Sequence, residues 1–307
     1  MGRYFTLFFL FSFTLNFAQP KIVGLVPARN EAPIIAQCLQ ALSLYTDSIV
    51  YLDDASTDNS LEIVCALTEE CNIEKIITKD VWFRDEPGDR NKLLQAGREI
   101  GGTHFLMLDA DEMPSSNCLK GDFLRKKILA LKPGERLRMN LIALWRSIDQ
   151  YRHDNSVWTS NYFDFAFCDD GKSSYSSEFI HTWRTPHGLS GIVYKLTSFK
   201  HCILHFQFVN WRNLLVKQAW YRCLERIRLP NKKVSEINKR YAQSKNEKSL
   251  TLKNSPSYWF DRYAFFDSTV YDRPEGWREK QITGWFNEYG KDYFAGLDIW
   301  DIDWEKD

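Results

Sequence analysis

The stretch FLMLDADEMPS, residues 105–115, runs from four apolar residues directly into two aspartates, Asp109 and Asp111. A short apolar run of this kind is typical of a strand that is buried on both faces of a parallel sheet. Carboxylates at positions i and i+2 of an extended segment point to the same side. Such a pair can bind a divalent cation, perform acid–base chemistry or begin a solvated loop, so the surrounding sequence has to decide.

Three strand–helix units precede this stretch. Apolar strands are predicted at KIVGLV (21–26), SIVYL (48–52) and EKIIT (74–78). A helix is expected after each, beginning near Pro33, within ASTDNS (55–60) and near Arg90. This alternation predicts a parallel sheet with right-handed crossovers, in which ligands bind at the carboxyl ends of the strands.

Polar side chains gather at those same strand ends. Arg29 to Glu31 follow the first strand, Asp53 and Asp54 the second, and the Asp109–Asp111 pair the fourth. After three strand–helix units, we interpret the pair as a site for Mg²⁺ or Mn²⁺, which prefer oxygen ligands and leave positions open for phosphate oxygens. A cation held there would neutralise a diphosphate leaving group.

Composition narrows the class of protein. The 307 residues suffice for one large α/β domain or two small ones, and Lys plus Arg equals Asp plus Glu at 40 each. This balance gives no basic field for nucleic acid, so no nucleic-acid partner is expected. Neither GxGxxG nor GxxxxGK[ST] occurs, which excludes dinucleotide dehydrogenases and P-loop proteins.

The N-terminus predicts membrane targeting. An apolar run at residues 4–18 follows Arg3, and it is shorter than the roughly 20 residues that span a bilayer as a helix. We interpret residues 1–20 as a signal peptide or a short membrane anchor, with possible membrane association through residues 4–18. A membrane-associated protein facing the cytoplasm is favoured, with export after signal cleavage as the alternative.

The sequence beyond the aspartates is less regular. A helix is predicted at 117–131, strands at 136–145 and 157–167, and a hairpin turn at DDGK (169–172). An apolar strand, HCILHFQF (201–208), leads into an amphipathic helix with Asn210 as its N-cap. Residues 231–255 are polar and Lys-rich, and the aromatic tail from Pro256 is expected to wrap the main domain.

Three motifs together resemble a family-2 glycosyltransferase of the GT-A fold: VPARNE (26–31), YLDDASTDNS (51–60) and LMLDADE (106–112). The resemblance covers residues 21–115. It implies an α/β fold with a single GT-A-like domain, a mostly parallel sheet flanked by helices, and an aromatic-rich helical C-terminal extension. The implied parts are a nucleotide-sugar-binding half (21–115), an acceptor-side half (116–230) and the extension (231–307).

The resemblance also implies an activity and a set of site residues. The activity is metal-assisted, inverting, non-processive transfer of a sugar from a nucleotide-diphosphate donor to a hydroxyl of a saccharide, lipid or protein acceptor, and the enzyme would be a hexosyl- or related transferase. The donor-binding residues would be Pro27, Arg29, Glu31, Asp53, Asp54, Arg90, Lys92 and Asp109. The metal, Mn²⁺ or Mg²⁺, would be held by Asp109, Asp111 and His205. Asp169 or Asp170 would be the catalytic base, since family members use a carboxylate downstream of the DxD.

Simpler readings of these residues stay open. Arg29 and Glu31 can form a plain salt bridge. Asp169 and Asp170 suit a hairpin turn nearly as well as catalysis. A histidine beside core residues, as His205 is, can be purely structural.

Two other functions compete with the transferase. A haloacid-dehalogenase-type phosphatase would use Asp109 as its nucleophile and Asp169–Asp170 to hold Mg²⁺. A non-catalytic sugar-binding relic of the fold would suit a protein with a signal-like start.

Overall fold

The computed structural model describes residues 19–159, 161–176, 182–273 and 276–304. Residues 1–18, which carry most of the predicted signal peptide or anchor, lie outside these ranges. Within the described ranges, no helix combines the length and the apolar character needed to cross a membrane.

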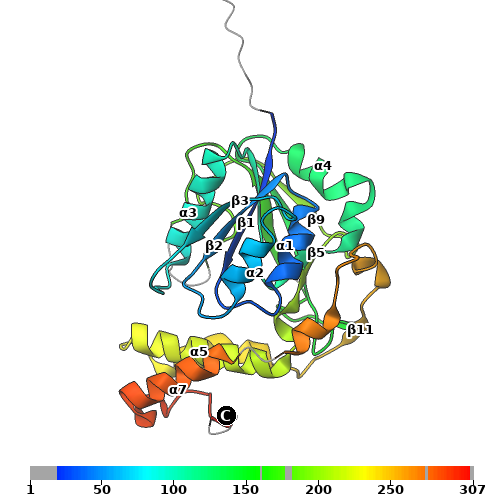
Figure 1. Cartoon of the computed structure of the whole chain (residues 1–307). Coiled ribbons are helices and arrows are strands. Elements are labelled where there is room, and N and C mark those ends of the chain that lie inside the picture. The colour runs from blue at the N-terminus through cyan, green and yellow to red at the C-terminus, as the bar shows by residue number, and fades with distance from the viewer. Residues whose placement is uncertain (1–18, 160, 177–181, 274–275, 305–307) are drawn as a thin grey trace, which may run out of the picture.

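A nine-stranded sheet forms the centre of the molecule (Figure 1). One half is parallel, in the order β3-β2-β1-β4, and the other half continues through β8, β6, β10 and β5, with β9 paired to β6. Antiparallel pairs occur where β8 joins β4 and β6 and where β5 joins β10. The strands are β1 (Ile22–Ala28), β2 (Ser48–Asp53), β3 (Ile73–Thr78), β4 (His104–Met107), β5 (Glu112–Pro114), β6 (Arg136–Ala143), β8 (Tyr162–Cys168), β9 (Val193–Leu196) and β10 (Ile203–His205). The predicted α/β fold with a mostly parallel sheet is confirmed.

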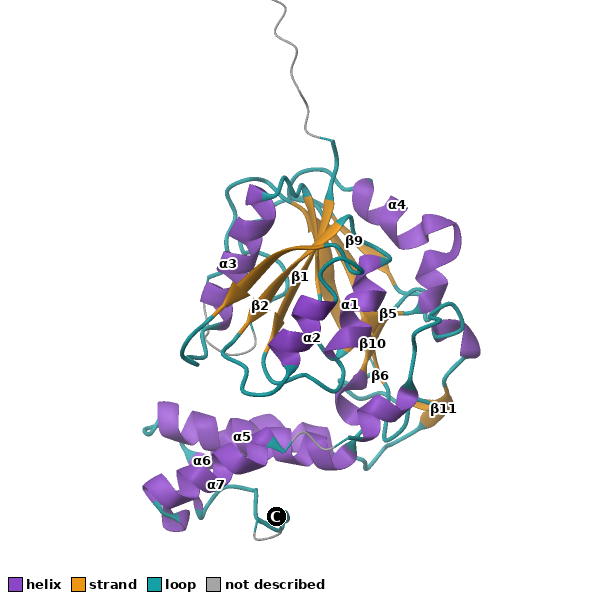
Figure 2. Ribbon diagram, viewed as in Figure 1, coloured by secondary structure: helices purple, strands orange, loops and turns teal. Residues whose placement is uncertain are grey.

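Helices cover the sheet and also form a separate layer beyond it (Figure 2). Those beside the sheet are α1 (Ile35–Ser43), α2 (Ser60–Ala66), α3 (Glu86–Glu99) and α4 (Phe123–Leu129). The layer below the sheet consists of α5 (Trp211–Arg228), α6 (Val234–Ala242) and α7 (Trp277–Tyr289). Two short strands, β7 (Gln150–Arg152) and β11 (Leu252–Asn254), pair separately. In the described part of the chain, 3-10 segments lie at 116–122, 206–208, 243–245, 257–259, 268–272 and 291–294.

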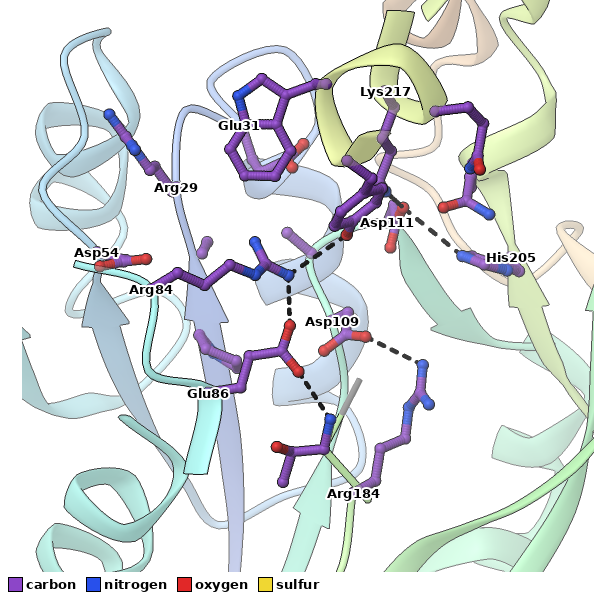
Figure 3. Close-up of a pocket in the computed structure, with 18 of the residues that line it drawn as sticks. Arg29, Glu31, Asp54, Arg84, Glu86, Asp109, Asp111, Arg184, His205 and Lys217 are labelled. Atoms are coloured by element: carbon purple, nitrogen blue, oxygen red, sulfur yellow. Dashed lines mark hydrogen bonds and ion pairs between the residues drawn. The ribbon is translucent and has the colours of Figure 1, made fainter. Parts of the chain in front are cut away.

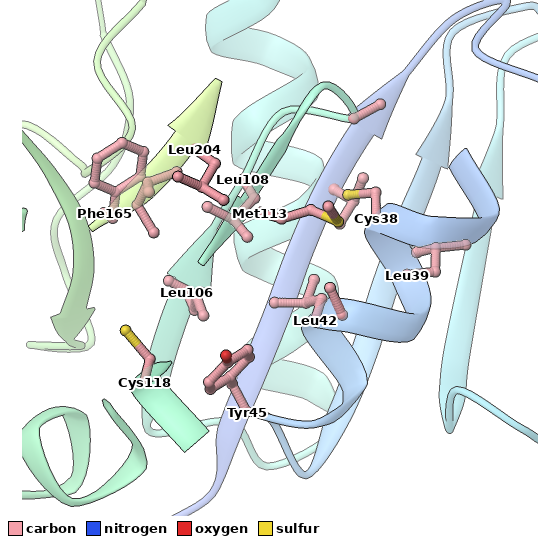
Figure 4. Close-up of a cluster of buried hydrophobic side chains, with 14 of the residues drawn as sticks. Cys38, Leu39, Leu42, Tyr45, Leu106, Leu108, Met113, Cys118, Phe165 and Leu204 are labelled. Atoms are coloured by element: carbon pink, nitrogen blue, oxygen red, sulfur yellow. The ribbon is translucent and has the colours of Figure 1, made fainter. Parts of the chain in front are cut away.

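The first helix is packed as its apolar stripe predicts. Cys38, Leu39, Leu42 and Tyr45 are fully or almost fully buried and face the central strands (Figure 4). Gly24 on β1 permits this approach, because a Cβ there would lie 2.6 Å from Cδ2 of Leu42. Close packing of this kind holds α1 against the strands that carry the site.

Two predicted helix boundaries are wrong. The third helix begins at Glu86 rather than Arg90, because Asp85 caps it by accepting from the Gly88 N–H and Pro87 occupies its first turn. The helix predicted at 117–131 is interrupted by Gly121 and Asp122, which adopt φ values of 62° and 55°. A left-handed backbone cannot continue an α-helix, so only α4 follows.

The hairpin predicted at DDGK is also wrong. The strand that follows β8 is β9, and it pairs in parallel with β6 instead of returning along β8. The Asp170 carboxylate closes a local turn by accepting from the Lys172 and Ser173 N–H groups. DDGK therefore does form a turn, as its composition predicts, but the strand after it pairs with β6 and not with β8.

The C-terminal tail wraps the main body, as expected. Trp259, Tyr263 and Tyr271 are buried in the same apolar cluster as α1 and the central strands. Further along, Ile282 and Phe286 of α7 join residues of α5 and α6 in a second cluster. The tail thereby fixes the helical layer against the end of the sheet.

Candidate functional site

A cavity of about 670 Å³ lies between the carboxyl ends of the parallel strands and the helical layer (Figure 3). Its lining comes from segments that are far apart in the sequence, which include the ends of β1 and β4, the loop after β3, the start of α3, the segment at 182–184, β10, α5 and α7. Of the predicted site residues, the lining includes Pro27, Arg29, Glu31, Asp54, Arg90, Asp109, Asp111 and His205. Asp53, Lys92, Asp169 and Asp170 do not line it.

The two aspartates lie in a tight turn rather than on the extended segment that the sequence predicted. β4 ends at Met107 and β5 begins at Glu112. The Asp109 N–H donates to Glu112 Oε2 at 3.1 Å, and the Glu112 N–H donates to the Asp109 carbonyl at 3.0 Å. Both aspartate side chains nevertheless point into the cavity (Figure 3).

Asp109 is held between two guanidinium groups. Arg90 Nη2 lies 3.2 Å from its Oδ1, and Arg184 Nη2 lies 3.0 Å from its Oδ2. Burial alone would raise the pKa of Asp109, but the charges of Arg184 and Arg90 outweigh it and hold the pKa below its ordinary value. Asp109 is therefore an anion in this environment.

Asp111 faces the other side of the cavity. Its Oδ2 accepts from Lys217 Nζ at 3.0 Å, and His205 Nε2 lies 3.6 Å from the same oxygen. Burial opposes ionisation here too, yet Lys217 and His205 hold the pKa of Asp111 well below its usual range. His205 reaches this position because β10 pairs with β5 in a register that sets it opposite Glu112.

Glu112 and Arg184 form the buried support of the aspartate turn. The Glu112 side chain is 0% exposed, and both its oxygens accept from Arg184. Burial raises the pKa of Glu112 and the neighbouring Arg184 charge counteracts this. Glu112 directly follows the second aspartate in LMLDADE, which was the signal for a third acidic residue that sequence reasoning passed over.

The end of β1 meets the C-terminal extension. The Arg29 guanidinium lies 4.5 Å from the ring centre of Trp82 and 5.1 Å from that of Trp277, a cation–π sandwich. The Glu31 carboxylate lies 3.7 Å from the Arg278 guanidinium. Glu31 therefore pairs with Arg278 and not with Arg29, in contrast to the plain salt bridge considered from the sequence. Burial raises the pKa of Glu31 to about 7, against the opposing charge of Arg278.

The acidic pair after β2 divides into two roles. Asp53 is 3% exposed, and its buried carboxylate accepts a hydrogen bond from the Ser56 N–H at 2.8 Å. Asp54 lines the cavity and pairs with Lys79, which also contacts Asp89 at 2.9 Å. Asp54 is thus the member of the pair that a ligand can reach.

Lys92 lies away from the cavity. Because α3 begins at Glu86, its inward face carries Asp89 and Arg90, then Leu93 and Leu94. The Lys92 side chain is 54% exposed and its nearest acidic partner is Asp89 at 3.6 Å. The sequence prediction of a donor-side lysine is not supported by this register.

Asp169 and Asp170 are placed at the opposite edge of the sheet from the Asp109 turn. β8 runs antiparallel to β4, and its last residue, Cys168, pairs with His104, the first residue of β4. Asp169 is engaged by Arg98 through two hydrogen bonds of 2.8 Å. This topology places Asp169 and Asp170 away from the cavity, so the structure does not support the predicted catalytic base at these positions. It also separates them from Asp109, beside which the phosphatase alternative needs them as metal ligands.

The predicted metal ligands match the chemistry of a hard or borderline cation. Two carboxylates and an imidazole suit Mn²⁺ or Mg²⁺, and Asp111 and His205 converge. Across the described ranges, however, no three or more His, Cys, Asp or Glu side chains group closely enough to form a metal site on their own. Oxygens from a bound ligand would have to complete the coordination.

Aromatic side chains form much of the remaining wall. Five tryptophans line the cavity: Trp82, Trp158, Trp183, Trp220 and Trp277. Trp183 is 60% exposed, and two residues with amide side chains, Asn161 and Gln207, also line the cavity. Flat apolar rings beside neutral amides suit polyhydroxylated ligands, which present both C–H faces and hydroxyl groups.

Residues 25–121 match the model of the family described as Glycosyl transferase family 2. The resemblance predicted from VPARNE, YLDDASTDNS and LMLDADE is thereby confirmed over this part of the chain. The match includes the ends of β1, β2 and β4 and the aspartate turn. It supports a glycosyltransferase. A search of curated proteins gives no match.

Several solved structures are similar to parts of the chain. A crystal structure of S. aureus TarS covers 91% of this chain and 81% of its own, at 14% identity and a TM-score of 0.39. A mannosyltransferase from Pyrobaculum calidifontis, solved with GDP-Man and Mn²⁺, covers 41% of this chain and 35% of its own, at 22% identity and a TM-score of 0.30. Glucosyl-3-phosphoglycerate synthase from Mycobacterium tuberculosis, solved with Mn²⁺, UDP and glucosyl-3-phosphoglycerate, covers 41% and 45%, at 20% identity and a TM-score of 0.29. The chain thus spans less than half the length of the latter two.

Proposed function

We propose that this protein transfers a sugar from a nucleotide-diphosphate donor to an acceptor hydroxyl. The observation that carries the proposal is the position of Asp109 and Asp111. They lie within the family-2 match, at the carboxyl end of β4, and face a cavity rich in cationic and aromatic side chains. A diphosphate needs positive charge around it, and a nucleoside and a sugar need flat surfaces and hydrogen-bonding groups.

The chain itself supplies charge for the leaving diphosphate. Arg84 and Lys217 line the cavity from the loop after β3 and from α5, and Arg278 lines it from α7. Lys217 lies on the side of Asp111, whereas Arg84 hydrogen-bonds to Tyr221 at 3.4 Å. Cationic donors fixed before the reaction stabilise charge that develops on the departing phosphate oxygens.

A divalent cation, Mn²⁺ or Mg²⁺, is part of the proposal. Asp109, Asp111 and His205 would hold it, and when bound it would neutralise the diphosphate as a Lewis acid. The role of the protein side chains is to keep both aspartates ionised and oriented, which the Glu112–Asp109 hydrogen bond and the neighbouring cations do.

The acceptor is proposed to enter beside Trp183 and Trp158. This wall belongs to residues 116–230, which we propose as the acceptor-side half, whereas residues 21–115 form the nucleotide-sugar half. The extension at 231–307 closes the cavity through Trp277 and Arg278. We further propose that the transfer is inverting and non-processive. We also propose that it takes place at the cytoplasmic face of a membrane.

Calorimetric titration tests the proposed donor site. UDP and GDP are added to the protein lacking residues 1–20, with and without Mn²⁺, and the titrations are repeated with the Asp109→Asn/Asp111→Asn variant. We expect metal-dependent binding of one nucleotide, at least tenfold weaker in the variant. Asp170→Asn is the matched control, since Asp170 lies outside the cavity, and it should bind as the wild type does.

Three results would oppose the proposal. Binding that survives the double substitution would place the nucleotide elsewhere. Hydrolysis of a generic phosphate ester without nucleotide binding would favour the phosphatase, and the absence of both activities would favour the non-catalytic sugar-binding protein.

A further inference from the structure

The aspartate turn is already surrounded by positive side chains. Arg90 and Arg184 contact the two oxygens of Asp109, and Lys217 contacts Asp111. With Glu112, which Arg184 also engages, the cluster contains three acidic and three basic side chains. Its formal charge is therefore zero before any ligand enters.

This balance opposes the entry of a free divalent cation. The side chains of Arg90, Arg184 and Lys217 are 6%, 12% and 15% exposed, so water screens their charges only weakly. A cation arriving alone would meet three positive side chains and would have to displace Lys217 from Asp111. A cation arriving with a nucleoside diphosphate brings an excess of negative charge that these same side chains can bind.

The basic residues differ in their freedom to move. Arg184 is fixed by Glu112 and lies about 5 Å from the rings of Phe163 and Phe165. Among the described residues, Asp111 is the one hydrogen-bond partner of the Lys217 ammonium group. A lysine is a point charge on a flexible chain, so it can exchange one oxygen for another without breaking a fixed geometry.

We propose that Lys217 acts as an electrostatic guard of Asp111: it excludes the free divalent cation and yields the carboxylate only when a diphosphate enters with that cation. The ammonium group then moves from the Asp111 oxygen to a diphosphate oxygen. Lys217 is a positioning residue in this scheme, carried by α5, whose first turn is capped by Asn210. The scheme rests on the proposed function for its diphosphate ligand.

Binding of Mn²⁺ to the full chain tests the guard. Free Mn²⁺ is measured by electron paramagnetic resonance during titration, with and without UDP, GDP or inorganic pyrophosphate. In the wild type we expect weak Mn²⁺ binding alone and at least tenfold tighter binding once the diphosphate is present. Lys217→Met should bind Mn²⁺ alone at least tenfold more tightly than the wild type, and the enhancement by diphosphate should shrink by a similar factor.

Two control variants isolate the charge at this position. Lys217→Arg keeps the positive charge and should behave more like the wild type than Lys217→Met does. Lys245→Met removes a lysine that pairs with Asp301 in the helical layer and should leave Mn²⁺ binding unchanged. Circular dichroism and thermal unfolding confirm that each variant is folded.

The outcomes separate the guard from the proposed function. If no diphosphate binds, the donor proposal fails, but tighter Mn²⁺ binding by Lys217→Met alone would still support the guard. Wild-type protein that binds Mn²⁺ equally well with and without diphosphate would overturn it. So would a folded Lys217→Met variant whose Mn²⁺ affinity equals that of the wild type.

Discussion

Glu112 is a fully buried ionisable residue at the aspartate turn. Its carboxylate accepts hydrogen bonds from the Asp109 N–H and from Arg184. It therefore fixes both the aspartate turn and the Arg184 guanidinium group. A buried carboxylate of this kind stabilises the site only while its hydrogen-bond donors are present, because an uncompensated buried charge is costly.

Replacement of Glu112 by Gln should therefore destabilise the protein. The amide keeps the size of the side chain but leaves Arg184 with less compensation, and we expect a loss of about 1–3 kcal/mol in the free energy of unfolding. Urea unfolding followed by circular dichroism measures it. Asp122→Asn, on a side chain that is 71% exposed, serves as the control and should change stability by less than about 0.5 kcal/mol.

Glu31 should make stability depend on pH. Burial raises its pKa from 4.5 to about 7, so the folded protein retains a proton that the unfolded chain releases between these values. Stability from this group is therefore greatest below pH 4.5 and declines as pH rises to 7, by about 3 kcal/mol in total. The difference in unfolding free energy between wild type and Glu31→Gln, followed from pH 5 to 8, reports it. A difference that stays constant over this range would refute the shift.

The acidic residues of the site were easier to predict from the sequence than the basic residues that contact them. Asp109, Asp111 and Glu31 were predictable because they follow buried strands whose ends meet at one edge. Lys217 was not selected, because it comes from a distant segment that only the tertiary fold brings to the aspartates. Lys217 did carry a signal, since it lies three residues after the buried Leu214 on the inward side of α5.

At the scale of elements, α5 is the support on which the helical side of the cavity depends. It carries Lys217, Trp220 and Tyr221 into the lining. Its start is fixed twice by Asn210, whose side chain accepts from the Asn213 N–H and donates to the Asp272 carbonyl.

Loss of this cap should be measurable. Asn210→Ala removes both hydrogen bonds and should lower the free energy of unfolding by about 1–2 kcal/mol. Asn210→Asp keeps the capping acceptor and should cost less, because only the bond to Asp272 is lost. Equal effects of the two substitutions in thermal unfolding would show that the cap contributes nothing.

Strand order explains which elements could be predicted. The four parallel strands follow the chain through repeated strand–helix units, and such units have one preferred handedness. β8 inserts antiparallel between β4 and β6, and no local pattern in YFDFAFC specifies that partner. Because β8 runs antiparallel to β4, Asp169 and Asp170 lie beside the start of β4 and not beside its carboxyl end, where the site was expected.

At the scale of the whole molecule, the C-terminal tail belongs to the main core as much as to the helical layer. Trp259 is 0% exposed, donates to the Phe199 carbonyl at 2.8 Å and contacts Tyr151. Its burial ties the extension to the body that holds the aspartate turn.

Truncation of Trp259 to Ala should accordingly destabilise the whole protein, by about 3–5 kcal/mol. Trp300, which is 41% exposed, provides the control, and Trp300→Ala should cost at most about 1 kcal/mol. Differential scanning calorimetry measures both. A separate early transition for the tail, with the main transition unmoved, would contradict the shared core.

The tryptophans around the cavity also give the protein a built-in optical reporter. Five of its 11 indole rings line the space that a ligand would fill, and two of them enclose the Arg29 guanidinium. Indole emission responds to nearby charge, stacking and loss of water. Occupancy of the cavity should therefore be visible in the intrinsic fluorescence of the unlabelled protein, and a library of nucleotides and glycans can be screened by light alone.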